Sequence, residues 1–307
     1  MTCLALFSRI SRDVMTLSVL VVPVLFAACG GEAGTVGPPP GSSSGSSGAS
    51  GSSGGGSGTG VDDPGGPRLT LALRGSVTPV THADALSGQT PSRQIVAIKS
   101  LWLYTSAADP SPVKVLDLGA KSVETDLVTG VTSEIGTVAL RSIPAGTYTL
   151  AKVGTAYVRY SVAARMHGPI TVDGRYDNVQ ALSDGAVIDG STRAKGWYRY
   201  AFSVGAMPYG VVEGEGAPVP QVPATGGIAL DSAGSDSFYV FPTLVVIDPT
   251  VPNDQRAVCE VNVHESFRWQ DQDGPGYAPR VYDTTPTSFE PVMAFGANGF
   301  TLQLEPK

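Results

Sequence analysis

Residues 258–270 read VCEVNVHESFRWQ, a stretch in which apolar and polar side chains alternate over thirteen positions. A period of two is that of a β-strand, because successive side chains of a strand point to opposite faces of the sheet. Val261 and Trp269 lie on the apolar side of this pattern, and Asn262 lies on the polar side. Glu265 is out of phase, so the pattern predicts either a β-bulge near it or a buried carboxylate with a partner.

The same alternation runs through the chain from Arg68 onward, and no segment keeps a helical period over three turns. The chain has 38 glycines and 24 prolines, residues that interrupt helices and form the turns between strands. We therefore expect an all-β fold, a β-sandwich. Strands are expected at residues 69–73, 95–104, 113–118, 147–153, 156–164, 196–204 and 238–247, with an interruption at Gly154 and an edge or bulge at Pro242.

A hairpin is expected near the C-terminus. Asn298-Gly299 lies between the apolar segments 291–297 and 300–305. Asn-Gly suits the type I′ turn, which needs positive φ at both central residues. In the second segment Phe300, Leu302 and Leu304 share one face.

Residues 1–28 have the pattern of an export signal. Arg9 and Arg12 precede a largely apolar run, 14–28, that is shorter than the roughly 20 residues a membrane-spanning helix needs. The run ends in LFAAC, residues 25–29, which resembles the lipobox of bacterial lipoproteins. The resemblance implies that cleavage leaves Cys29 as a lipidated N-terminus and that Gly30 directs the protein to the outer membrane. The alternative is an ordinary secretory signal cut after Ala28.

The segment that follows is predicted to be a tether. Residues 29–67 are rich in Gly, Ser and Pro and have few side chains that folding could bury. We expect this disordered linker to hold a folded part away from a membrane. The folded part is expected to comprise a β-sandwich module, 68–165, and a second β region, 166–307, packed on the first.

A short motif carries a second resemblance. Residues 142–150 read SIPAGTYTL, and the Pro-Ala-Gly-Thr-Tyr-Thr turn and strand is similar to one in transthyretin-like and carboxypeptidase-regulatory-like β-sandwiches. Residues 95–153 also resemble an uncharacterised domain of secreted bacterial lipoproteins. The resemblance implies a prealbumin-like sandwich and carries no catalytic residues.

Aromatic side chains are the candidate ligand-binding residues. Around residues 197–202 they alternate with Arg199, so aromatic rings face both sides of that strand. One set is expected in the core, and the other could stack on sugar rings. The candidates are Trp197, Tyr198, Arg199, Tyr200, Trp269 and Tyr277.

Metal and catalytic signals are weak. His82, His167 and His264 are the only histidines and have no ligand-like spacing. His264 and Glu265 would point to opposite faces of a regular strand. Asp271 and Asp273 precede Gly274 as in the start of a calcium loop, but Pro275 follows and no Glu closes the loop. No cofactor is expected, and these two aspartates are only a weak calcium candidate.

These features together favour one function over two alternatives. The net charge is −7 with no Lys/Arg cluster, which argues against a nucleic-acid partner. Cys259 has apolar neighbours and is expected to be a small buried side chain rather than a nucleophile. We expect a lipid-anchored cell-envelope protein with a non-enzymatic β-sandwich that binds or scaffolds at the envelope, where its partner is a cell-surface glycan or an envelope protein. The alternatives are a carbohydrate-binding or adhesin-like module and a hydrolase with a loop-built site.

Overall fold

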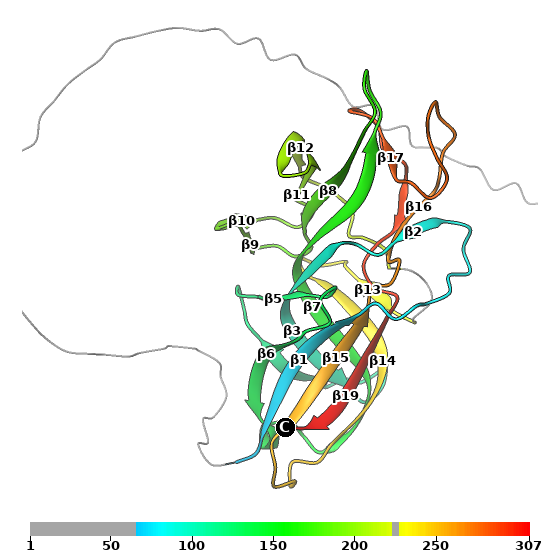
Figure 1. Cartoon of the computed structure of the whole chain (residues 1–307). Helices are drawn as coiled ribbons and strands as arrows, with labels where there is room; N and C mark the ends of the chain where they lie inside the picture. The colour runs from blue at the N-terminus through cyan, green and yellow to red at the C-terminus, as the bar shows by residue number, and fades with distance from the viewer. Residues whose placement is uncertain (1–65, 223–226) are drawn as a thin grey trace, which may run out of the picture. The chain divides into compact units, whose positions relative to one another are not determined.

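The computed structural model describes residues 66–222 and 227–307 (Figure 1). The predicted signal, the predicted lipidation site Cys29 and nearly all of the predicted tether lie outside the described residues. The described part is almost entirely β-structure, which confirms the all-β prediction. Its helical element is the single 3-10 turn Leu140–Ser142.

A four-stranded sheet forms one layer of the fold. Its order is β19-β15-β1-β6. The bounds are β19 Gly299–Pro306, β15 Gln255–Asn262, β1 Arg68–Ser76 and β6 Thr132–Ala139. Strands β1 and β15 are parallel, whereas the outer two pairs are antiparallel. Because β1 and β15 come from opposite ends of the folded part, the predicted regions 68–165 and 166–307 share this sheet.

A ten-stranded sheet forms the other large layer, in the order β12-β11-β8-β7-β14-β13, with β3 and β17 also paired to β7 and with β4 and β5 paired to β3. The bounds are β3 Arg93–Tyr104, β4 Val113–Asp117, β5 Val123–Asp126, β7 Gly146–Met166, β8 Val172–Ala181, β11 Tyr198–Val204, β12 Met207–Gly214, β13 Ala229–Asp231, β14 Ser237–Ile247 and β17 Asp283–Thr284. Two small sheets complete the fold: β18 (Val292–Ala294), β16 (Phe267–Trp269) and β2 (Ser87–Gln89) in one, and β9 (Ala186–Ile188) with β10 (Ser191–Arg193) in the other.

Strand β7 organises the large sheet. Its 21 residues pair with β14 through their first half and with β8 through their second half. Gly154 does not interrupt it, which corrects the prediction of two separate strands. Ser100 of β3 lies so close that a Cβ at Gly154 would be 2.2 Å from its Oγ, so glycine allows β3 and β7 to pack closely there. Pro242 does mark a bulge, as expected, because the pairing of β14 with β7 shifts between Pro242 and Val245.

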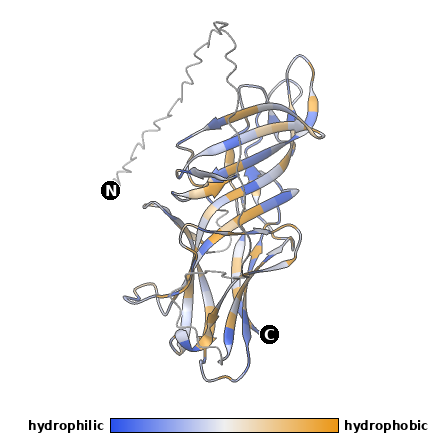
Figure 2. Cartoon of the chain, turned by 90° about the vertical axis from the view of Figure 1, so that its left-hand side faces the viewer, coloured by the Kyte–Doolittle hydropathy of each residue, from blue (hydrophilic) through white to orange (hydrophobic). Residues whose placement is uncertain are grey.

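Two large hydrophobic clusters lie on the ten-stranded sheet, the first between it and the four-stranded sheet and the second between it and β16. In the first, Leu69, Leu71 and Leu73 of β1 are each 1% exposed and pack with residues of β3, β7 and β14. The second contains Tyr160 of β7 together with Phe267 and Trp269 of β16. Hydrophobic and hydrophilic residues alternate along the strands that border these clusters (Figure 2). The alternation seen in the sequence thus produces the buried faces of a sandwich.

The structure corrects the long strand expected over residues 258–270. Strand β15 ends at Asn262, and β16 begins at Phe267 in a different sheet. The chain turns between them, where Glu265 adopts a positive φ of 45° and Ser266 N–H donates to the Val263 carbonyl. The out-of-phase Glu265 therefore marks the turn between two strands, and it is half-buried rather than buried.

The hairpin expected at Asn298-Gly299 is absent from the described residues. Strand β18 pairs with β16, and β19 pairs with β15. Asn298 is buried, and its Nδ2 donates to Asn262 Oδ1 at 2.9 Å and to the His264 carbonyl at 2.5 Å. This side chain links β19 to the end of β15, and neither Asn298 nor Gly299 has the positive φ of a type I′ turn.

Candidate binding surface

The predicted aromatic strand is β11, and two of its tyrosines form a partly exposed pair. Tyr198 and Tyr200 are half-buried, and their ring centroids are 4.9 Å apart with planes tilted by 43°. The side chain of Tyr198 lies across Gly214 of β12, where a Cβ would be 2.5 Å from its Oη. Tyr200 stands opposite Asn178 of β8, so the pair continues the face that bears the second hydrophobic cluster.

Arg199 points to the opposite face of β11, where charged side chains pair with one another. Its Nε lies 3.2 Å from Glu213 Oε1. Further ion pairs of this face join Arg159 to Asp189 at 2.7 Å and Arg175 to Asp177 at 3.0 Å. The hydrogen bond from Arg159 lowers the pKa of Asp189. The charges on this face therefore neutralise one another locally, and Arg199 is paired with Glu213.

The two candidate tryptophans, Trp197 and Trp269, are covered by protein, which argues against their assignment as ligand-binding residues. Trp269 is 1% exposed, packs against Tyr282 with centroids 5.6 Å apart, and donates from Nε1 to Asp271. Trp197 is 6% exposed, and the Arg193 guanidinium lies 4.0 Å from its ring centroid. Tyr277 is half-buried against the His167 ring. Of the predicted aromatics, the structure gathers only Tyr198 and Tyr200 at one surface.

Strand β12 next to this pair is exposed, although no sequence pattern predicted it. Met207, Tyr209, Val211 and Val212 are 69%, 67%, 46% and 51% exposed. In the described part of the chain β12 pairs only with β11 and forms the outer edge of the large sheet (Figure 1). The signal that could have located it is the apolar run after the turn at Gly205, but apolar composition alone does not reveal exposure.

Of the two aspartates of the predicted calcium loop, Asp271 has structural partners. Asp271 accepts hydrogen bonds from Ser87 Oγ at 2.6 Å and from Trp269 Nε1 at 2.9 Å. Asp273 is exposed. Neither belongs to the group of His, Cys, Asp or Glu ligand atoms that converges within the described residues. The structure therefore assigns Asp271 to the support of β2 and β16.

A buried polar cluster holds the segment after β16. Glu290 accepts from the backbone N–H of Gln272 at 2.7 Å and of Asp283 at 2.8 Å. Asp283 is fully buried and lies 2.7 Å from His167 Nε2. Burial raises the pKa of Glu290. These groups are occupied in fixing the backbone of residues 271–290, and sequence spacing gave no sign of them because His167 comes from the end of β7.

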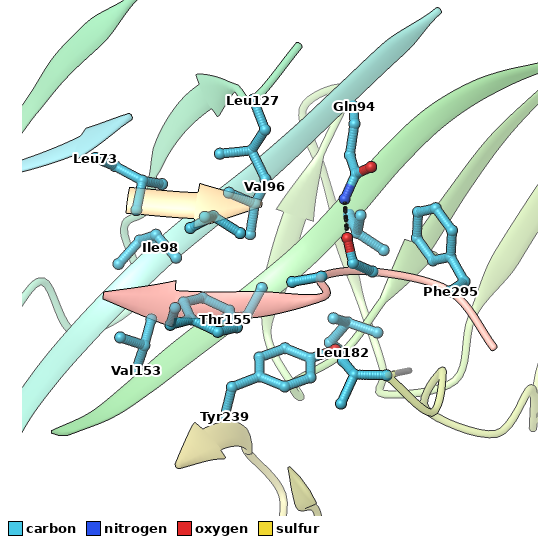
Figure 3. Close-up of a pocket in the computed structure, with 16 residues that line it drawn as sticks. Leu73, Gln94, Val96, Ile98, Leu127, Val153, Thr155, Leu182, Tyr239 and Phe295 are labelled. Atoms are coloured by element: carbon cyan, nitrogen blue, oxygen red, sulfur yellow. Dashed lines mark hydrogen bonds between the residues drawn. The ribbon is translucent and has the colours of Figure 1, made fainter. Parts of the chain in front are cut away.

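A small cavity lies where the two hydrophobic clusters meet (Figure 3). Its volume is about 40 Å³, and most of its lining is apolar. Gln94 Nε2 donates to the Gly296 carbonyl at 2.6 Å at its edge, and the buried Thr155 hydroxyl has no hydrogen-bond partner among the described residues. This space suffices for water but is far smaller than the roughly 300 Å³ of a ligand pocket.

Cys259 is a core residue, as predicted. It is 4% exposed, and burial raises the pKa of its thiol to about 12. A thiol that stays protonated at neutral pH is a poor nucleophile.

Comparisons with known proteins found no matching family model, curated protein or solved structure. Among the residues that the structure describes, no helix has the length and apolar character to cross a membrane.

Proposed function

We propose that this chain is a lipid-anchored cell-envelope protein, a tethered binding module whose recognition surface is the β11–β12 edge.

 The protein is exported, held at the outer membrane by lipid on Cys29, and carries a non-enzymatic domain that binds an extended segment of another envelope protein. The observation that carries the binding function is the exposed apolar edge strand β12. Anchoring is supported by the lipobox-like residues 25–29 and by the Gly/Ser-rich segment 29–67.

An edge strand has unpaired backbone N–H and C=O groups, and a partner strand can satisfy them by adding to the sheet. Proteins usually protect such an edge with charge, proline or a bulge. In β12 these devices are confined to the ends: Pro208 lies near the first residue, beside a shift in the pairing with β11, and Glu213 lies near the last. Tyr209, Val211 and Val212 between them remain exposed.

The shape of the surface favours a polypeptide over a sugar. Stacking on a sugar ring uses an exposed, flat aromatic face. The rings of Tyr198 and Tyr200 are tilted by 43° to each other, and Trp197 and Trp269 are buried. Exposed aliphatic side chains along a free strand suit the alternating side chains of an added strand. Glycan binding is therefore the alternative function, and a glycan array tests it.

The binding surface is tested with a displayed library of peptides and with a glycan array, using the full chain. We expect the wild-type chain to select peptides from the library. The affinity of these peptides should fall at least about tenfold in Val211→Lys, because a charge at the edge opposes strand addition. Val246→Lys is the matched control, since Val246 is an exposed β-branched residue on β14. Binding to glycans alone, or equal loss in both variants, would refute recognition by this edge.

Anchoring is tested by the mass of the mature N-terminus and by fractionation. We expect a lipid-modified Cys29 at the N-terminus and loss of the protein from the membrane fraction in Cys29→Ser. An unmodified Cys29 in the wild-type protein would refute the anchor without bearing on the edge strand.

A further inference from the structure

Two segments that are far apart in the sequence meet at one end of the four-stranded sheet. Strands β1 and β15 are parallel neighbours, so the loop after β1 and the turn after β15 leave the sheet at the same end. Backbone and side-chain hydrogen bonds join them: Val263 N–H donates to the Ser76 carbonyl at 2.8 Å, and Asn262 Nδ2 donates to the Thr78 carbonyl at 2.9 Å. The loop is thereby held against the turn.

This junction brings together two histidines and a carboxylate. Ligand atoms of His82, from the loop, and of His264 and Glu265, from the turn, all lie within 4.8 Å of one another. All three residues are half-buried. The positive φ of Glu265 makes this possible, because neighbours on a regular strand point to opposite faces.

The ring of His82 indicates that a bound ion is missing from the cluster. Both of its ring nitrogens are buried, and neither has a hydrogen-bond partner among the described residues. Buried polar side-chain atoms nearly always have a partner, and an imidazole with free nitrogens is a good metal ligand. An ion bound between the three side chains would supply the missing partner.

The turn is held in a strained conformation by specific contacts. Non-glycine residues seldom adopt positive φ, and such strain gathers at functional sites. Glu265 N–H donates to Thr90 Oγ1 at 2.8 Å, and Asn298 Nδ2 donates to the His264 carbonyl at 2.5 Å. These contacts fix the backbone that carries both side chains before any ion binds.

The charged groups around Glu265 leave its carboxylate available. Arg268 Nη1 lies 3.8 Å from one carboxylate oxygen, and Arg280 Nη2 lies 3.7 Å from the other, both beyond hydrogen-bond distance. Arg268 bonds instead to Asp84. The two guanidinium groups repel a cation, so the free energy gained from the coordination bonds must exceed this repulsion.

We propose that His82, His264 and Glu265 bind a divalent transition metal ion of the zinc class. Two imidazoles and one carboxylate are ligands that zinc and its neighbours prefer, whereas calcium and magnesium prefer oxygen ligands alone. Three protein ligands leave a coordination position open for water or for a ligand from another molecule.

Metal binding has a local consequence at His264. Val80 N–H donates to His264 Nδ1 at 3.3 Å, so this nitrogen carries no proton. A metal on Nδ1 displaces the Val80 donor. A metal on Nε2 requires the proton there to leave and Nδ1 to be protonated in the neutral ring, which also ends the bond. In either arrangement the environment of the Val80 amide changes.

The test is a calorimetric titration with Zn²⁺ of the full chain, stripped of metal and held in detergent. We expect one ion per chain, and a shift of the Val80 amide resonance in nuclear magnetic resonance spectra. Loss of a residue that only supports a metal ligand typically lowers metal affinity about 10–100-fold. His82→Ala and Glu265→Gly each remove a ligand, so each should lower the Zn²⁺ affinity by at least that factor. Glycine suits the positive φ at position 265, so the second variant loses the ligand without loss of folding.

Asp273→Asn is the control, because Asp273 is an exposed carboxylate outside the cluster, and its Zn²⁺ affinity should match that of the wild-type protein. Absence of stoichiometric Zn²⁺ binding by the wild-type chain would overturn the proposal. So would unchanged affinity in both His82→Ala and Glu265→Gly.

Discussion

At the scale of single residues, the hydroxyl of Thr155 is the clearest defect in the packing. It lines the small cavity, and it is buried without a hydrogen-bond partner among the described residues. An unsatisfied buried polar group costs about 1–3 kcal/mol. We therefore expect Thr155→Val, which replaces the hydroxyl with a methyl group, to raise the free energy of unfolding by about 1 kcal/mol. Thermal and denaturant unfolding measure the change.

Thr70→Val is the matched control for this prediction. Thr70 is equally buried, but its Oγ1 accepts from Lys307 Nζ at 3.0 Å and from Thr137 Oγ1 at 3.4 Å. Its replacement should lower the free energy of unfolding by about 1 kcal/mol. Destabilisation by Thr155→Val as well would mean that water in the cavity satisfies that hydroxyl in solution.

At the scale of the element, β1 depends on one glycine. A Cβ at Gly75 would lie 1.6 Å from the backbone oxygen of Leu127, and a backbone atom cannot move aside as a flexible side chain can. We expect Gly75→Ala to destabilise the protein by about 3 kcal/mol or more, the upper range for overpacking. Gly146→Ala in β7 is the control, because nothing lies within 4 Å of the added Cβ. Similar midpoints of denaturant unfolding for the two variants would contradict the close approach.

At the scale of the whole folded part, the two hydrophobic clusters are joined. Strand β7 contributes to both, and Phe300 packs against both, with its ring 4.8 Å from Phe241 and 6.1 Å from Tyr239. We expect a single unfolding transition with equal calorimetric and van't Hoff enthalpies, the mark of two-state unfolding. Two resolved transitions in scanning calorimetry would show that the predicted regions 68–165 and 166–307 unfold separately.

The places where sequence reasoning failed share a cause. Asn298-Gly299 has a strong local preference for a hairpin, but β19 pairs with β15 along its whole length, and the Asn298 side chain bonds to Asn262 and His264 at the end of that pairing. Trp269 follows an alternating pattern that cannot distinguish a core face from a ligand platform. The cluster of His82 with His264 and Glu265 has no spacing to detect, because its members meet only through the parallel pairing of β1 and β15.

The sequence by itself determined the all-β class, the main strands and the buried position of Cys259. These follow from the alternation of side chains and from turn residues, which act over a few positions along the chain. Only the tertiary structure decided which strands pair, that β12 forms an exposed edge, and that the loop after β1 lies against the turn after β15. Those outcomes depend on contacts between segments far apart in the chain, and such contacts leave no local pattern.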